Sequence, residues 1–333
     1  MTGNVEKAIF QKLTPIMASK LRFYGILVFA VYIVAYILGR NDVSLEFGGF
    51  PESLEWSIQR PIDAVFEWTG NNLSWFFGPI SDVVDATLNV FEKFLLWMPW
   101  TVVVISTGLF ALKVSNWRMS LFCSLSLLLI GLLGLWDSAM ITVSLMGISV
   151  LLAVAIGVPL GIAASFNDRV EAVIRPILDV MQVMPAFVYL MPALFLFGVG
   201  GTVSIFLTVV YAIPPAIRLT NLGIRQVPQE IVETSKSHGS TAIQTLLHVQ
   251  LPMAKPSVMM GINQTIMMAL AMVVIASMIG VKGLGVPILR AVLNQYLALG
   301  LLNGLAIVAL AIIFDRIAQE YGRRIQKHRG YKK

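Results

Sequence analysis

The sequence has very few cysteines and few charged residues for its length. Cys123 is the only cysteine among 333 residues, so an internal disulfide framework is excluded. Charged side chains make up 13% of the chain, about half the share that a soluble globular domain carries. Hydrophobic residues make up 57%. These proportions predict an integral membrane protein.

The sequence also lacks the patterns of common catalytic and metal-binding sites. No GxxxxGK[ST] phosphate loop occurs, and the glycine clusters at 198–201 and 283–285 follow no predicted strand. His238, His248 and His328 show no metal-ligand spacing. We therefore expect no catalytic residue, no metal and no cofactor in this chain. Its basic residues are spread over turns beside apolar runs, so no nucleic-acid partner is expected.

Ionisable residues are missing from the middle of every predicted span. Asp179, Arg218 and Asp315 fall near predicted span ends. Proton-driven carriers use intramembrane carboxylates or histidines, so that mechanism is disfavoured. A sodium-driven carrier can rely on backbone carbonyls, so an ion-coupled secondary carrier that acts without an ATPase stays open as an alternative. A membrane scaffold or sensor without transport is a third interpretation.

Long apolar runs dominate what is present. Each is close to the roughly 20 residues that a helix needs to cross a bilayer. The first run is interpreted as a retained span, because residues 38–42 offer no signal-peptide cleavage site. The fold class predicted is all-α, a polytopic membrane helix bundle of about eight transmembrane helices. The runs are 23–39, 97–112, 119–136, 139–165, 177–200, 202–221, 257–280 and 299–317.

The positions of lysine and arginine predict the orientation. An even number of spans puts both termini on one side, and a cytoplasmic assignment places most of the 24 lysines and arginines in that compartment. The predicted organisation is a cytoplasmic N-terminus and first helix (1–40), an external acidic and aromatic amphipathic segment (41–96), a transmembrane domain (97–320) and a basic cytoplasmic tail (321–333). The tail is an orientation signal or touches anionic membrane lipid.

The longest polar interruption covers residues 225–256 and is predicted to lie in the cytoplasm. It reads as two short helices separated at Gly239, and Thr241 and Gln244 have the spacing of a capping box. The second helix is amphipathic, so it suits an apolar groove on a partner. A hairpin that lies on the lipid surface is the alternative. The apolar residues of this helix are Ile243, Leu246, Leu247 and Leu251.

The same segment resembles the EAA loop of binding-protein-dependent ABC importer permeases. That family pattern is Glu-Ala-Ala, three residues, Gly, nine residues, Ile, any residue, Leu-Pro. In this chain, Thr234 and Ser235 replace the two alanines, and Val249 replaces the isoleucine. The resemblance implies a coupling loop that docks into an ATP-hydrolysing subunit and transmits its motion to the membrane helices. The residues assigned to coupling are Glu233, Thr234, Ser235, Gly239, Ile243, Leu246, Leu247, Val249, Leu251 and Pro252.

Three further stretches look like the permease subunit of glycine betaine/proline betaine ABC importers. They are residues 175–200, 211–233 and 261–285, within a similarity that covers roughly 90–320. The resemblance implies a homodimer of this chain in the bacterial inner membrane, two ATP-binding subunits that hold ATP and Mg, and an external substrate-binding protein. The implied solutes are small methylated amines: glycine betaine, proline betaine, choline, carnitine or trimethylamine N-oxide.

Residues that could line a translocation path are aromatic, amide or hydroxyl side chains and prolines within spans. Prolines remove helix hydrogen bonds, so we expect them to interrupt or kink the fifth and sixth spans. Packing is the alternative for the aromatic residues, and inter-helix hydrogen bonding for the amides. The path residues are Pro185, Phe187, Tyr189, Pro214, Pro215, Asn263, Gln264 and Thr265.

Two strips of small residues recur every four positions and predict close helix packing. The first consists of Ala153, Gly157, Gly161 and Ser165, and the second of Gly261, Thr265 and Ala269.

Overall fold

The computed structural model describes Phe29 and residues 59–327. The chain divides into two units, Met1–Ala64 and Val65–Lys333, and the second holds nearly all described residues. Helices form throughout this described part, which contains no β-strand. The predicted first span (Phe29 excepted), the start of the acidic segment and the end of the basic tail lie outside the described residues.

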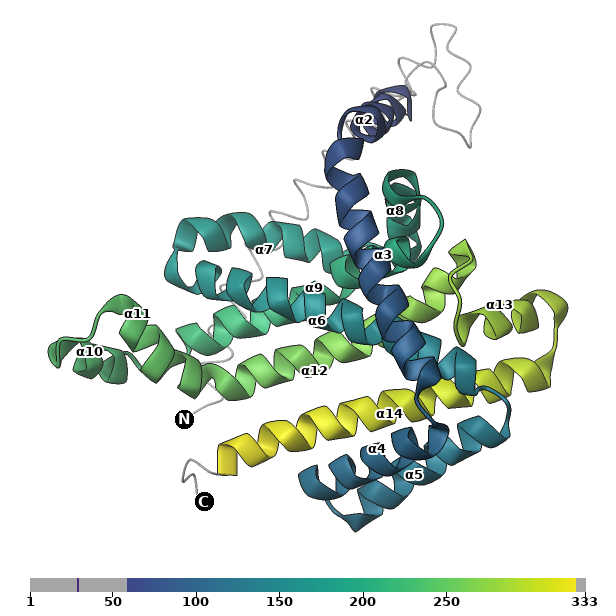
Figure 1. Ribbon diagram of the computed structural model, residues 1–333. Coiled ribbons are helices and arrows are strands. Elements are labelled where there is room, and N and C mark those ends of the chain that lie inside the picture. The colour runs from purple at the N-terminus through teal and green to yellow at the C-terminus, as the bar shows by residue number, and fades with distance from the viewer. Residues whose placement is uncertain (1–28, 30–58, 328–333) are drawn as a thin grey trace, which may run out of the picture. The chain divides into compact units, whose positions relative to one another are not determined.

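The described helices follow one another with short connections (Figure 1). Their bounds are α2 Gln59–Asn72, α3 Ser74–Trp97, α4 Trp100–Val114, α5 Trp117–Leu132, α6 Trp136–Phe166, α7 Asp168–Val183, η2 Ala186–Tyr189, α8 Leu190–Phe197, α9 Gly201–Arg225, α10 Gln229–Ser237, α11 Ala242–Thr245, η3 Leu246–Gln250, α12 Leu251–Ala276, η4 Ser277–Ile279, α13 Gly285–Asn294 and α14 Leu297–Lys327.

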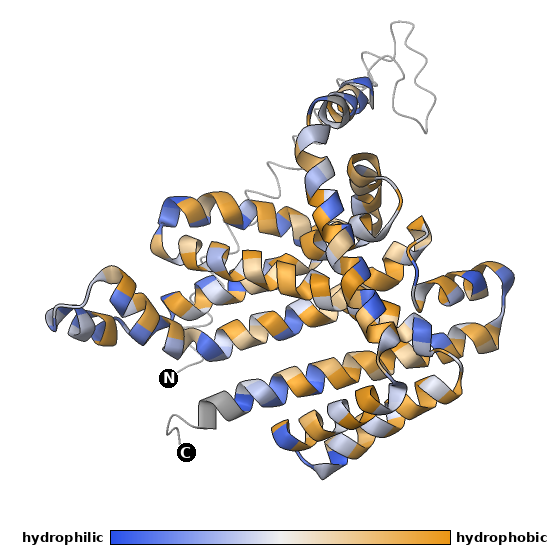
Figure 2. Cartoon of the chain, viewed as in Figure 1, coloured by the Kyte–Doolittle hydropathy of each residue, from blue (hydrophilic) through white to orange (hydrophobic). Residues whose placement is uncertain are grey.

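The core of the second unit is the packing of α9 between α6 and α12. Both of these helices contact α9 extensively, and α14 packs along α12 (Figure 1). The hairpin of α4 and α5 contacts α14. Apolar residues cover most of these helices, as Figure 2 shows in orange. The central position of α9 explains why so many of its side chains are buried.

The small-residue strips allow this close packing, as the sequence predicts. A Cβ atom built on Gly161 of α6 would lie 2.6 Å from the carbonyl oxygen of Ile217 in α9. A Cβ atom on Gly261 of α12 would lie 3.0 Å from the carbonyl oxygen of Pro215 on the same helix, α9. Backbone therefore meets backbone on both sides of α9. A Cβ atom at Gly161 would overlap α9, and one at Gly261 would force its neighbours to shift.

We expect Gly161→Val to destabilise the protein by about 1–3 kcal/mol, because the new side chain must push α9 away from α6. The check is the thermal unfolding midpoint of the purified chain in detergent. Gly304→Val in α14 is the matched control, since no atom lies within 4 Å of a Cβ built there. An equal loss of stability in both variants would contradict this account.

Four helical segments are long and apolar enough to cross a membrane: α6, α9, the continuous stretch Ala242–Ile279 and Leu297–Arg323 of α14. Two bent pairs raise the number within the described residues to six. One pair is α3 with α4, bent by 97°, and the other is α7 with the η2–α8 segment, bent by 109°.

Two of the apolar runs predicted as spans therefore belong to bent pairs. The run at 97–112 is α4, the second arm of the first pair, and the run at 177–200 contains the second bend. The run at 119–136 corresponds to α5, which has 16 residues and is shorter than a standard span. Apolar composition marks such segments, but it does not encode their bends.

The prolines behave in two different ways. Pro185 lies between α7 and η2 at the second bend, so the predicted interruption of that span is confirmed there. Pro214 and Pro215 lie inside α9, which continues through both, so the predicted interruption of the sixth span was wrong. Both residues are buried in α9, which packs between α6 and α12. Such packing by neighbouring helices is what allows a helix to continue through proline in a membrane.

Candidate functional site

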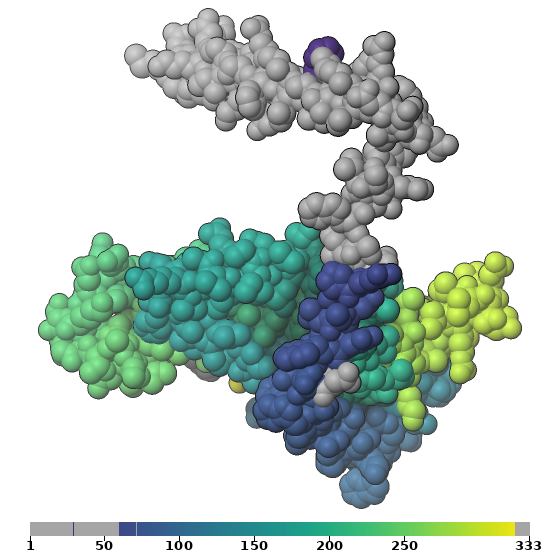
Figure 3. Space-filling view, turned by 90° about the horizontal axis from the view of Figure 1, so that it is seen from above, coloured from purple at the N-terminus to yellow at the C-terminus, as the bar shows by residue number. Residues whose placement is uncertain are grey.

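The coupling loop, defined here as Gln229–Gln250, consists of α10, α11 and η3. These elements gather at one end of the second unit, where Figure 3 shows them as a projecting green lobe. None of the residues of α10 is buried, and its sequence is mostly polar. The loop is therefore a surface feature attached to apolar helices.

Gly239 makes the turn that separates the two short helices. Its φ angle is 81°, in the left-handed region, and its N–H donates to the carbonyl oxygen of Lys236 at 2.9 Å. The N–H of Ser240 donates to the carbonyl oxygen of Ser235 at 3.3 Å. Glycine adopts this conformation without the steric cost that other residues incur, and it commonly ends helices in this way. The predicted break at Gly239 is confirmed.

The second helix begins with the predicted capping box. The N–H of Gln244 donates to Oγ1 of Thr241 at 3.3 Å, and the N–H of Thr241 donates to Oε1 of Gln244 at 2.8 Å. This exchange satisfies two backbone donors that the helix start leaves open. The start of α11 is thus fixed by its own residues.

A hydroxyl pair joins the two helices of the loop. Oγ of Ser235 on α10 lies 3.2 Å from Oγ1 of Thr245, whose residue is only 2% exposed. Alanine, which the EAA pattern has at this position, has no hydroxyl for this contact. Thr234 instead donates to the carbonyl oxygen of Glu230 in its own helix at 2.7 Å. The serine that replaces alanine at position 235 therefore contacts Thr245, and this contact was not predicted from the sequence.

The apolar residues of the second helix divide into two groups. Leu246 is buried against Ile224 and Ala254, and Leu251 packs against the same cluster. Ile243 and Leu247 remain 70% and 52% exposed. Leu246 and Leu251 thus pack inside this chain, although helical spacing in the sequence places them on the same face as Ile243 and Leu247. Ile243 and Leu247, four residues apart, are the part of this face that is open to a partner.

The coupling loop continues directly into the long apolar helix α12. In η3 the backbone forms a π-helical turn, and the N–H of Leu251 donates to the carbonyl oxygen of Leu246. Pro252, which has no N–H, follows at once inside α12. The residues Ala242–Ile279 form one helical segment of 38 residues. This continuity replaces the predicted separation between a short coupling helix and a span at 257–280.

The remaining coupling residues lie on or beside this loop. Glu233 is exposed on α10, and its carbonyl oxygen accepts a hydrogen bond from Oγ of Ser237 at 2.9 Å. Val249 is half-buried in η3. The Glu233 carboxylate has no ion pair among the described residues.

An arginine network anchors the helices at the end where the coupling loop begins. The Nη2 atom of Arg225 lies 2.8 Å from Oδ1 of Asp168 and 3.0 Å from Oε2 of Glu171. It also donates to the carbonyl oxygen of Ala164 at 2.9 Å, while Nε donates to Oδ1 of Asn221 at 3.0 Å. Arg225 therefore ties α6, α7 and α9 together. From the sequence it is only a topology signal, since its partners lie far apart in the chain.

The aromatic candidates for the path occupy unlike environments. Tyr189 is buried, donates from its hydroxyl to the carbonyl oxygen of Met181 at 2.5 Å and meets the ring of Tyr211 edge-on at 6.3 Å. Phe187 is 54% exposed. Tyr189 therefore braces the bend after α7, a role that fits the packing interpretation.

The polar candidates on α12 also face different surroundings. Nδ2 of Asn263 donates to Oδ1 of Asp315 on α14 at 2.7 Å, which is the inter-helix hydrogen bond given above as the alternative. Gln264 is exposed. Thr265 is fully buried, and its Oγ1 has no hydrogen-bond partner among the described residues. Their assignment to a translocation path stays a prediction.

Comparison with known proteins identifies a family. The model of the family described as "Binding-protein-dependent transport system inner membrane component" matches residues 153–327. The glycine betaine/proline betaine transport system permease protein ProW of Escherichia coli K12 is 44% identical over 270 residues, covering 79% of this chain and 75% of that protein. The glycine betaine transport system permease protein OpuAB of Bacillus subtilis 168 is 42% identical over 258 residues, covering 78% of this chain and 92% of that protein.

More distant proteins share the fold or part of the sequence. The trimethylamine N-oxide transport system permease protein TmoV of Ruegeria pomeroyi is 35% identical over 289 residues, covering 84% of this chain and 44% of that protein. A chain from inward-facing structures of the MetNI methionine ABC transporter superposes with a TM-score of 0.52 at 18% identity, over 57% of this chain and 95% of that chain. The helical fold and the family resemblance predicted from the sequence are confirmed. The chain belongs to the family of inner membrane components of binding-protein-dependent transport systems.

Proposed function

We propose that this chain is the permease subunit of an ATP-driven importer for glycine betaine or a related methylated amine. The names of the relatives support this substrate class. The structural observation that supports the proposal most directly is that Ile243 and Leu247 are exposed on a helix that continues into α12. The partners proposed are a second copy of this chain, two ATPase subunits that bind ATP and Mg, and an external substrate-binding protein.

The continuous helix supplies a route for force. ATP binding draws the two ATPase subunits together, and a groove on each holds the exposed pair Ile243 and Leu247. The segment Ala242–Ile279 then moves with the ATPase as one lever. Because α12 packs against both α9 and α14, its displacement changes the contacts of the helices around the path. The permease itself needs no catalytic residue for this role.

The proposed location is the bacterial inner membrane with both termini in the cytoplasm. The α4–α5 turn, the α6–α7 turn and the coupling loop lie toward the same end as the C-terminal part of α14, and Figure 2 shows blue residues at these places. Lys113, Arg118 and Arg169 lie in the helix ends that flank these turns. Trp97 and Trp136 lie at the opposite helix ends. The basic residues at this end follow the positive-inside rule, and tryptophans such as Trp97, Trp117 and Trp136 lie at helix ends, as expected for both membrane interfaces.

Reconstitution in lipid vesicles tests the function. We expect accumulation of radiolabelled glycine betaine when the chain is combined with its ATPase, the binding protein and ATP. Competition by choline, carnitine or trimethylamine N-oxide then ranks the solutes. Accumulation driven by a sodium gradient through this chain alone would favour the secondary carrier. Copurification of the ATPase without any solute flux would favour a scaffold.

A further inference from the structure

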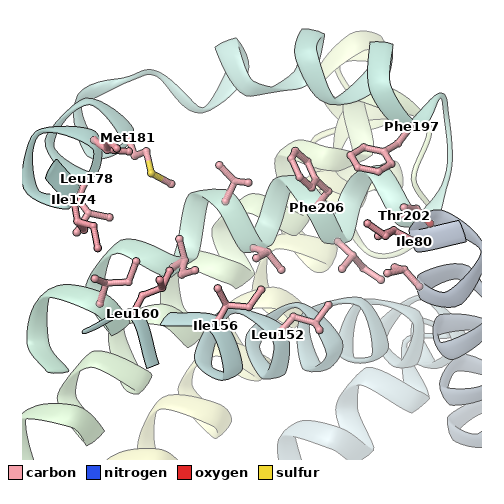
Figure 4. Close-up of a pocket in the computed structure, with 17 residues that line it drawn as sticks. Ile80, Leu152, Ile156, Leu160, Ile174, Leu178, Met181, Phe197, Thr202 and Phe206 are labelled. Atoms are coloured by element: carbon pink, nitrogen blue, oxygen red, sulfur yellow. The ribbon is translucent and has the colours of Figure 1, made fainter. Parts of the chain in front are cut away.

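An apolar groove runs between α7 and the packed pair of α6 and α9, with α3 and α8 at one end. Its volume is about 570 Å³, within the range of small-molecule sites. Figure 4 shows its walls extending from Ile174 and Leu178 at one end to Thr202 and Ile80 at the other, with Ile156 between them. We name this feature the apolar groove.

The apolar lining of the groove extends over a length that is sufficient to span the hydrocarbon layer of one membrane leaflet. Its α9 wall runs from Thr202 to Ile217, which at the helical rise corresponds to roughly 22 Å. Half of a bilayer's hydrocarbon core is about 15 Å. Thr202 is the one hydroxyl residue of the lining, and its Oγ1 donates to the carbonyl oxygen of Ser81 at 3.2 Å. No lining side chain is therefore left to attract a polar occupant.

A basic pocket adjoins one end of this groove. The pocket has a volume of about 370 Å³ and shares three lining residues with the groove: Ile174, Leu178 and Ile217. Its other lining residues include three arginines, Arg175, Arg218 and Arg225, and one acid, Glu171. Hydrocarbon surface thus passes directly into an end lined by three arginines.

The three arginines differ in how far they are neutralised. Arg225 is paired with Asp168 and Glu171, and Arg218 is paired with Asp179. Arg175 is exposed and has no ion pair among the described residues. Arg175 is therefore the arginine of this pocket whose positive charge is available to pair with an anion. It lies on α7, one residue after Ile174, whose side chain lines the groove.

We propose that the apolar groove and its basic end bind one anionic phospholipid. An acyl chain lies in the groove, and the phosphate lies at Arg175. The charge pattern favours a lipid over an apolar helix of a second copy, because a helix would leave Arg175 without a counter-charge. Basic pockets between membrane helices on the cytoplasmic side are suited to anionic headgroups. The proposal rests on the proposed orientation, which puts this end at the cytoplasmic face, but it is independent of the transported solute.

Native mass spectrometry of the purified full-length chain, titrated with phosphatidylglycerol and phosphatidylcholine, tests the site. We expect wild type to prefer phosphatidylglycerol and Arg175→Gln to lower that preference by about fivefold. Ile156→Trp fills the groove, so it should remove the bound lipid of either kind. Arg118→Gln is the matched control: it removes one charge from a pocket of about 380 Å³ at the α4–α5 turn that shares no lining residue with the groove.

Three results would overturn the proposal. The first is an equal loss of preference in Arg175→Gln and Arg118→Gln, which would mean that any surface charge attracts the lipid. The second is unchanged lipid binding in Ile156→Trp. The third is efficient disulfide dimerisation of Leu160→Cys in a Cys123→Ser background, in native membranes, which would show that a second copy of this chain lies at the groove.

Discussion

Leu247→Asp is expected to reduce ATP-driven uptake to background while the protein still reaches the membrane in normal amount. Leu247 is 52% exposed and lies beside Ile243, which is 70% exposed. In the proposed complex both are enclosed by the ATPase. A carboxylate placed there must lose its water without gaining a partner, at a cost of several kcal/mol. The measurements are solute uptake into reconstituted vesicles and the amount of ATPase that copurifies with the permease.

His248→Asp provides the matched control. His248 is the next residue along, is also exposed, and has its Nδ1 atom 3.1 Å from the carbonyl oxygen of Gln244 in its own helix. The variant adds the same carboxylate to the same turn but removes no apolar contact, so most uptake should remain. Equal failure of both variants would assign the loss to charge alone. Normal uptake by a well-expressed Leu247→Asp protein would refute docking through this residue.

Local features of the coupling loop are predictable because neighbouring residues determine them. The capping box needs only Thr241 and Gln244, and the turn needs a residue that adopts positive φ, which Gly239 supplies. The glycines of α6 and α12 are similar, since a smooth strip at four-residue spacing has few uses other than close packing. The all-α fold class and the local shape of this loop could therefore be predicted from the sequence.

The division of the apolar face could not be predicted from helical spacing. Leu246 and Leu251 are five residues apart, which in an α-helix places them about 140° from each other. The π-helical turn at η3 contains about one extra residue, so both side chains pack inward while Leu247 points outward. A periodicity of 3.6 therefore assigns the wrong members to the exposed face.

Long-range polar contacts were also beyond the reach of sequence reasoning. Arg225 bonds to Ala164, 61 positions away, and Asn263 bonds to Asp315, 52 positions away. No spacing rule connects such residues, because the packing of α6, α9, α12 and α14 brings them together. The same holds for Pro214 and Pro215, whose effect on α9 depends on the helices packed on either side. The roles of these residues depend on how deeply they are buried and on which helices pack against them.

The second large effect expected is at Gly239, where a graded series separates conformation from bulk. The φ angle is 81°, and no atom lies within 4 Å of a Cβ atom built on this residue. Space is therefore available for a side chain, and only the backbone conformation restricts substitution. Gly239→Asn should retain most uptake, because asparagine adopts positive φ more readily than other non-glycine residues. Gly239→Val should lose much of it, since β-branched residues strongly disfavour this region.

Gly239→Pro should abolish uptake. Proline fixes φ near −65° and removes the N–H that donates to the carbonyl oxygen of Lys236 at 2.9 Å. The turn must then open, which separates Ser235 from Thr245 and withdraws α10 from α11. Since α11 continues into α12, the membrane helices should keep their fold, and the unfolding midpoint in detergent should stay close to wild type. Vesicle uptake that falls in the order Asn, Val, Pro at constant midpoint would show that the loop acts through its shape. A drop in midpoint that parallels the loss of uptake would instead mean that Gly239 supports the fold as a whole.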